Sequence, residues 1–246
     1  MIIVKKINLQ ESRSKFYRKN KNLIFLLQKR FFWMKKFIFK KKIVIELGSG
    51  NCLIKNILHK KIICTDITPL KNLSLKLDMN NLKLNKKFNN NVDVFIFNHS
   101  LHHSYNPEKL LRIISKKYLK KYGYVLINEP ELSIIFKLFL KFFKHEKYDS
   151  NIKNKNKKFF WYENNATGRL LFKNKKINSF FQDYNVVKNH LSECLIFLNS
   201  SGNGVNSIYI KLNFFFLKII YLIDIVLVKL CPSIFALNRS IVLQKI

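Results

Sequence analysis

The chain has 246 residues, enough for one domain with a substantial core and an added cap or extension. Lys and Arg outnumber Asp and Glu by 46 to 14, which gives a formal net charge of +32. This excess favours phosphate-bearing partners, but Lys, Asn, Ile and Phe are all frequent, which also matches an A/T-rich codon bias. The charge is therefore weak evidence of function.

Four cysteines occur without any CxxC spacing, which argues against a zinc site or a disulfide framework. Reduced, packed thiols are typical of cytosolic proteins. The first residues lack the apolar core and the cleavage site of a signal peptide. We therefore expect a cytoplasmic protein.

Residues 1–41 form a basic N-terminal extension in which aromatic residues alternate with lysines. Apolar residues at 23, 26, 27, 31 and 34 have helical spacing and predict a helix within 14–41. We favour a helix that packs on the domain and covers the ligand site. An interfacial helix on anionic lipid is the alternative, and nothing specific supports an RNA-binding helix.

The central part of the chain, residues 42–130, alternates strands and helices. Residues 42–47 predict a buried strand, Gly48-Ser49-Gly50 a tight turn, and residues 53–58 the start of an amphipathic helix. This geometry places a polar ligand over a helix N-terminus, and Glu46 ends the strand. The glycines allow close approach to the ligand.

Further strands continue this pattern. Residues 61–66 end in Asp66, about twenty residues after Glu46, where an acid can accept hydrogen bonds from ribose hydroxyls. Residues 92–97 form the next strand, which leads into Asn98 and the sequence HSLHH. A helix over 107–121, capped by Asn106 and ended by Gly123, then precedes a strand over 124–130.

Four segments in this order resemble the class I S-adenosylmethionine-dependent methyltransferases, of the methyltransferase type 11 kind. They are ELGSG at 46–50, the acid at the end of the second strand, Leu77-Asp78-Met79, and the strand leading into LHH and then PE. The resemblance implies a Rossmann-like α/β fold. In that fold a mostly parallel twisted sheet has helices on both faces and an antiparallel last strand. The implied cofactor is S-adenosyl-L-methionine.

The resemblance also implies which residues contact the cofactor: Glu46, Gly48, Gly50, Asp66, Ile67, Asp78, Met79 and Asn98. Glu46 would order the glycine loop or meet the amino-acid end, Asp66 would hold the ribose, and Asp78 with Met79 would lie near the adenine. Asn98 would lie against the methionine portion. Cys52 stands where a third glycine is expected.

His103, the second histidine of LHH, is the first candidate for a general base that takes a proton from the acceptor. A structural histidine that caps a helix or bonds a loop carbonyl remains open. The HxxHH pattern has no carboxylate or cysteine at ligand spacing, so we expect no metal site.

Residues 131–246 are interpreted as an aromatic, helical cap with a closing strand. We expect a helix at 131–145, a helix near 175–182, a strand at 184–190, a helix at 208–230 and a last strand at 235–245. Aromatics and an Asn pair at 159–168 either line a substrate pocket or pack under a loop. Lys218 and Asp224 favour a buried or interfacial helix over a membrane span.

The leading hypothesis is a methyltransferase for a small molecule, in particular a sugar or a lipid-linked glycan, with possible contact to the inner face of the plasma membrane. Glu129-Pro130, residues 161–168 and the Ser-Gly loop at 200–204 loosely resemble a subgroup from bacterial cell-surface polysaccharide clusters. Two alternatives stay open. One is an RNA methyltransferase, supported only by charge, and the other is a catalytically silent module that binds a membrane surface or a partner.

Overall fold

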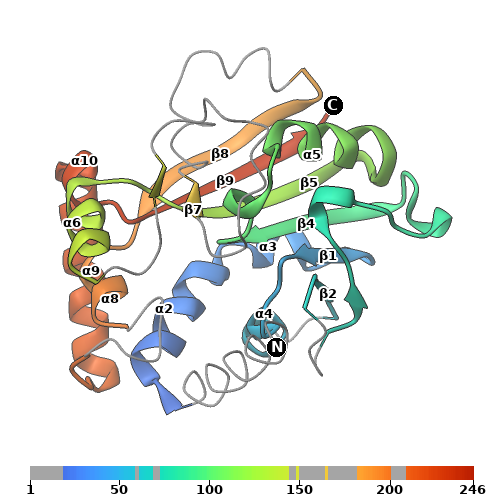
Figure 1. Cartoon of the computed structure of the whole chain (residues 1–246). Helices are drawn as coiled ribbons and strands as arrows, with labels where there is room; N and C mark the ends of the chain where they lie inside the picture. The colour runs from blue at the N-terminus through green and yellow to red at the C-terminus, as the bar shows by residue number, and fades with distance from the viewer. Residues whose placement is uncertain are drawn as a thin grey trace, which may run out of the picture.

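The computed structural model describes residues 19–58, 61–68, 73–143, 182–200 and 209–246, and two short strands, β6 (Tyr148–Asp149) and β7 (Asn164–Asn165). Seven strands form one sheet in the order β3-β2-β1-β4-β5-β9-β8 (Figure 1). Their bounds are β1 Val44–Leu47, β2 Ile63–Asp66, β3 Leu75–Lys76, β4 Val92–Asn98, β5 Leu119–Pro130, β8 Tyr184–Ser192 and β9 Asn238–Lys245.

The first five strands of this sheet pair in parallel, and β9 pairs antiparallel with both β5 and β8. The last strand of the chain is thus inserted between two others, where both of its edges are hydrogen-bonded. This arrangement confirms the predicted Rossmann-like fold with an antiparallel last strand.

Side chains alternate along β1 and β4 between two apolar layers, as a buried parallel sheet requires. Ile45, Leu47 and Phe95 face a core shared with α5 (Pro107–Ile113) and the following η4 (Ile114–Tyr118). Val44 and Val94 face the opposite core. That second core is shared with α2 (Lys21–Phe32), α3 (Lys35–Ile38), α4 (Leu53–Leu58) and α6 (Ile134–Phe143).

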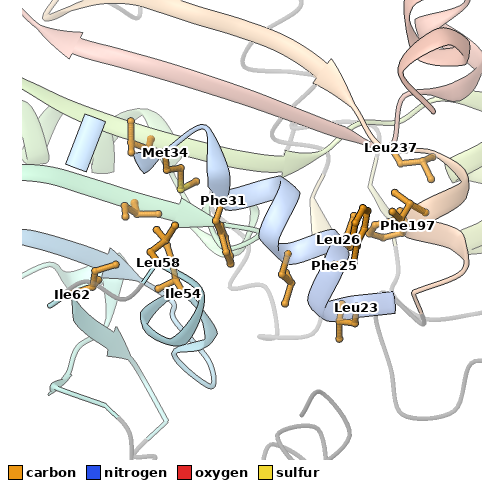
Figure 2. Packing of buried hydrophobic residues seen from close by; sticks show 14 of the residues in the cluster. Leu23, Phe25, Leu26, Phe31, Met34, Ile54, Leu58, Ile62, Phe197 and Leu237 are labelled. Atoms are coloured by element: carbon orange, nitrogen blue, oxygen red, sulfur yellow. The ribbon is translucent and has the colours of Figure 1, made fainter. Parts of the chain in front are cut away.

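Helix α2 is part of this second core. Asn20 caps the helix by accepting a hydrogen bond from the Leu23 backbone N–H at 3.0 Å. Figure 2 shows Phe31 of α2 near Ile54 of α4, and Leu26 near Phe197. The predicted amphipathic helix therefore packs on the domain, as favoured from its sequence. The predicted boundary between an N-terminal extension and the core at residue 41 stays a prediction.

The helix predicted over 107–121 is shorter in the structure. Helical turns end at Tyr118, β5 starts at Leu119, and Gly123 lies inside this strand instead of ending the helix. The pairing of β5 with β4 explains the difference, because Leu119 already pairs with Val92 before a register shift. Sheet pairing thus overrides the local glycine signal.

The C-terminal helices α6, α8 (Leu195–Leu198), α9 (Phe214–Leu230) and α10 (Pro232–Phe235) gather at one end of the sheet (Figure 1). The helix predicted from residue 208 begins at Phe214, because Asn213 accepts a hydrogen bond from the Phe216 backbone N–H. Within the described ranges no helix is long and apolar enough to cross a membrane.

Several expectations fall on other parts of the chain. The aromatic segment at 159–168, apart from the short strand β7, and the helix near 175–182 lie outside the described residues. So does most of the Ser-Gly loop at 200–204. The strand predicted at 184–190 is present as β8. The one predicted at 235–245 is present as β9 but begins at Asn238, because Phe235 belongs to the short helix α10.

Candidate functional site

The predicted site residues gather at the carboxyl edge of the parallel strands. Leu47 pairs with Thr65 of β2 and with Phe97 of β4. Asp66 and Asn98 each come one residue after those partners, so both lie beside the turn that starts at Gly48. Ligands of open α/β sheets bind at this edge.

Gly48 is the point at which three segments meet. Its φ of +71° lies in the left-handed region, and a β-carbon placed on it would lie 2.7 Å from Ser100 Cβ and 3.0 Å from Met79 Cε. The loops after β1 and β4 and the residues after β3 therefore converge here, and only glycine fits at the junction.

Asp66 fixes the second half of the glycine loop. Its Oδ2 accepts a hydrogen bond from the Gly50 backbone N–H at 3.0 Å, and its Oδ1 accepts one from Thr68 N–H at 2.9 Å. Gly50 has a φ of +50°, which directs its N–H toward the end of β2. Ile67, next to Asp66, is about half exposed at this rim.

Glu46 lies beneath the glycine loop and faces the sheet interior. Its side chain is buried, and the Cys64 thiol donates to its Oε2 over 3.8 Å. Burial raises the pKa of this carboxyl well above its ordinary value, and the nearby Cys64 adds to the effect. The two roles predicted for Glu46, ordering of the glycine loop and contact with the amino-acid end of the cofactor, both stay predictions.

Asp78 and Met79 lie on the other side of the junction. Asp78 caps the short helix η1 (Met79–Asn81), with its Oδ1 accepting from the Asn80 backbone N–H at 2.8 Å. The Asn80 side chain accepts in turn from Tyr105 N–H at 2.8 Å. This bond ties the region after β3 to the loop after β4, so the two form one rim.

The loop after β4 is held from below by Glu129, a fully buried acid near the end of β5. Its Oε1 accepts hydrogen bonds from the backbone N–H groups of Ser100 at 3.1 Å and Leu101 at 2.7 Å. Its Oε2 lies 2.5 Å from Nδ1 of His102. Ser100 also donates its hydroxyl to the Leu47 carbonyl at 2.6 Å, which joins this loop to β1.

The three histidines of HSLHH occupy different surroundings. His99 has a φ of +52°, and its Nε2 lies 3.1 Å from Asn238 Oδ1. Burial lowers the pKa of His99 well below its ordinary value, with a smaller effect from Arg30. His102 is buried against Glu129, whereas His103, in η3 (Leu101–His103), is only half-buried. His99 and His103 are both partly exposed, and His102 is the most buried of the three.

Asn98 is connected to a polar network that sequence reasoning missed. The Asn128 amide approaches Asn98 Oδ1 at 3.5 Å, and Asn128 Oδ1 accepts from the Ser240 hydroxyl at 2.7 Å. Ser240 also bonds Asn238, the partner of His99. These residues come from β5 and β9, far apart in sequence. In the sequence, this network is indicated only by the polar residues at the end of the apolar strand predicted at 124–130.

No group of three His, Cys, Asp or Glu side chains is placed to hold a metal ion in the part of the chain that the structure describes. The site consists of the glycine loop at 48–50, the carboxylates of Asp66 and Asp78, and the loop after β4 that carries the histidines. It is suited to binding and orienting a polar ligand with hydroxyl or amino groups.

Two solved structures with the same architecture are methyltransferases. An S-adenosylmethionine-dependent methyltransferase from Archaeoglobus fulgidus is 15% identical, with a TM-score of 0.54 over 95% of this chain and 99% of its own. Geranyl diphosphate C-methyltransferase from Streptomyces coelicolor A3(2) was solved with Mg²⁺, geranyl diphosphate and S-adenosyl-L-homocysteine. It is 7% identical, with a TM-score of 0.52 over 90% of this chain and 80% of its own.

No family model matches the sequence, and no curated protein matches it either. The structural likeness establishes the fold: this chain has the class I S-adenosylmethionine-dependent methyltransferase fold, as its motifs predicted. The loose resemblance to the polysaccharide-cluster subgroup stays a prediction.

Proposed function

We propose that this protein binds S-adenosyl-L-methionine and transfers its methyl group to a small-molecule acceptor. The observation that carries the proposal is the convergence at Gly48, where a β-carbon would lie 2.7 Å from Ser100 and 3.0 Å from Met79. Because Gly48 has no β-carbon, the loops after β1 and β4 and the residues after β3 can close on one another and form a single rim at the sheet edge where ligands of such folds bind. The residues around it fit the cofactor.

Each rim residue has a group suited to one part of that cofactor. Asp66 has carboxylate oxygens to accept from ribose hydroxyls, and Asp78 can accept from the adenine amino group. Met79 supplies an apolar surface beside the base. Asn98, at the end of β4, would lie against the methionine portion, and Glu46, which is buried just before the turn, would order the glycine loop.

The cofactor, when bound, supplies an activated methyl group on a sulfonium, so the protein's task is to orient the two reactants. The loop after β4 is fixed by Glu129 and by the bond from Ser100 to Leu47. His103 lies on this fixed loop and is the proposed base that takes the acceptor's proton at an imidazole nitrogen.

For the acceptor we propose a sugar or a lipid-linked glycan. The net charge of +32 favours an acceptor with phosphate groups, as lipid-linked sugars have. The apolar surface of the C-terminal helices favours an acceptor that is presented at a membrane. RNA carries phosphate groups as a lipid-linked sugar does, but it has no lipid chain to contact this apolar surface.

Calorimetric titration with S-adenosylmethionine and S-adenosylhomocysteine tests the proposal. We expect wild-type protein to bind both, and Asp66→Asn to bind each at least about tenfold more weakly, because the neutral amide is a poorer acceptor. Asp93→Asn is the matched control. Asp93 also accepts two backbone N–H groups, from Lys42 and Ile43, but at the start of β4. Folded wild-type protein that binds neither compound would refute the proposal.

A further inference from the structure

Helix α9 has stripes of side chains on opposite sides, and among the described residues only one of these stripes packs against the rest of the domain. Leu217, Asp224 and Val228 are buried against the domain, with Tyr221 half-buried between them. The opposite stripe consists of exposed residues at spacings of three or four: Phe215, Ile219, Leu222, Val226 and Leu230. Residues at this spacing share one face of a helix.

The exposed stripe is open to solvent along the whole helix. Phe215 is 66% exposed near its start, Leu222 61% in the middle and Leu230 72% at its end. An apolar face of this length is uncommon on the free surface of a monomer and marks an interaction site. At about 1.5 Å per residue the helix is about 25 Å long, enough to lie along a bilayer surface.

The charges around the stripe identify the kind of partner. We define the helical cap as residues 131–143, 193–200 and 209–235, and its three acids are all buried. Glu131 pairs with Arg239 at 2.6 Å, and Glu193 with Arg30. Asp224, the one acid of α9, caps α8 by accepting from three backbone N–H groups, at residues 194, 195 and 196.

In contrast to the buried acids, all lysines of the helical cap are exposed: Lys137, Lys141, Lys211, Lys218 and Lys229. Lys218 and Lys229 are eleven residues apart, about three helical turns, and lie together along one flank of the exposed stripe. Long lysine side chains can keep their charge in the headgroup region while the stem covers apolar surface.

We propose that the exposed stripe of α9 docks on a bilayer that contains anionic phospholipids, with the helix lying in the plane of the interface. Its apolar side chains enter the acyl boundary, and Lys218 and Lys229 meet the lipid phosphates. A second copy of this chain is a poor occupant, since a two-fold contact would set the same lysines against each other on a protein of net charge +32.

Flotation with vesicles tests the docking with the full chain and no cofactor, so its result is independent of methyl transfer. We expect the protein to float with vesicles of phosphatidylcholine and phosphatidylglycerol in equal parts, and far less with phosphatidylcholine alone. The variant Leu222→Ser/Val226→Ser should bind the anionic vesicles at least about tenfold more weakly. Both sites are exposed, so the fold should persist.

Two controls match these changes. Val187→Ser removes a similarly exposed apolar side chain from β8 and should leave binding unchanged. Lys218→Gln/Lys229→Gln should weaken binding by about tenfold, whereas Lys83→Gln/Lys86→Gln, with the same loss of charge elsewhere, should have a much smaller effect. Circular dichroism of each variant confirms that it is folded.

Two results would overturn the proposal. One is equal flotation of the wild type and Leu222→Ser/Val226→Ser, which would show that other surfaces bind the lipid. The other is a wild-type dimer in light scattering that this variant converts to a monomer, which would make a second copy the occupant. Loss of cofactor binding in the calorimetric test would leave the flotation result, and this proposal, unaffected.

Discussion

Nδ1 of His102 lies 2.5 Å from Oε2 of Glu129, and both side chains are buried. The same carboxylate accepts the backbone N–H groups of Ser100 and Leu101. One acid of β5 therefore fixes the loop that begins where β4 ends. That loop also carries His103, so its position depends on residue 129, which is distant in the sequence.

Glu129→Ala should lower the free energy of unfolding by about 3 to 5 kcal/mol, because it leaves two backbone N–H groups and a buried histidine without their acceptor. Glu129→Gln should cost less, since an amide oxygen can still accept from both N–H groups. Urea unfolding measures each change. Glu108→Ala, which removes a partly exposed partner of Arg112, should cost less than about 0.5 kcal/mol. Similar losses for Glu129→Ala and Glu108→Ala would contradict this role.

Gly48→Ala should destabilise the protein by about 2 kcal/mol or more and weaken cofactor binding, because alanine is strained at a φ of +71° and its β-carbon meets Ser100 at 2.7 Å. Adding Ser100→Gly removes the Ser100 β-carbon, which is the atom that the new methyl group would clash with. Because Ser100→Gly also loses the hydrogen bond to the Leu47 carbonyl, it is measured alone as well, and the double variant should be less destabilised in urea unfolding than the sum of the two single variants. Additive losses would show that the close approach is not the cause.

Much of the sheet edge could be predicted from sequence because its signals are local. A β-branched run followed by Gly48 and Gly50 indicates a strand and a turn, and Asp66 ends the next short strand. Such signals depend on neighbours within a few residues. The parallel pairing of β1, β2, β4 and β5 agrees with the predicted alternation of strands and helices, whereas their order in the sheet was not predicted.

The supports of the site could not be predicted in this way, because they come from residues distant in sequence. Glu129 meets residues about thirty positions earlier, and Asn238 reaches His99 across 139 positions. The start of β5 at Leu119 was also missed, since its pairing with Val92 outweighs the local signal of Gly123. Contacts of this kind are set by the sheet order and not by local pattern.

Cys52 occupies the position of a third glycine with a left-handed φ of +55°, and its side chain is buried. Cys52→Gly relieves the backbone strain but loses apolar contact, whereas Cys52→Ala keeps the strain and loses the sulfur. We therefore expect the glycine variant to be about 1 kcal/mol more stable than the alanine variant. Thermal or urea unfolding of the pair decides this, and the reverse order would show that the contacts of the β-carbon dominate.

We expect the free energy of unfolding to decrease in acid because of His190. Burial lowers the pKa of this histidine from 6.5 to about 4, with a smaller effect from Lys188. The unfolded chain binds a proton near pH 6.5, while the folded protein does not bind it until about pH 4. The free energy of unfolding therefore falls as the pH drops through this window, and the loss is complete below the folded pKa.

His190→Gln removes this contribution, because glutamine does not titrate. Urea midpoints of the wild type and the variant, compared at about pH 7 and about pH 4.5, should show a smaller acid-dependent decrease in the variant. Carboxylates and His99 titrate in both proteins, so their effects cancel in the comparison. Parallel decreases would show that His190 takes up its proton equally well in the folded and unfolded chains.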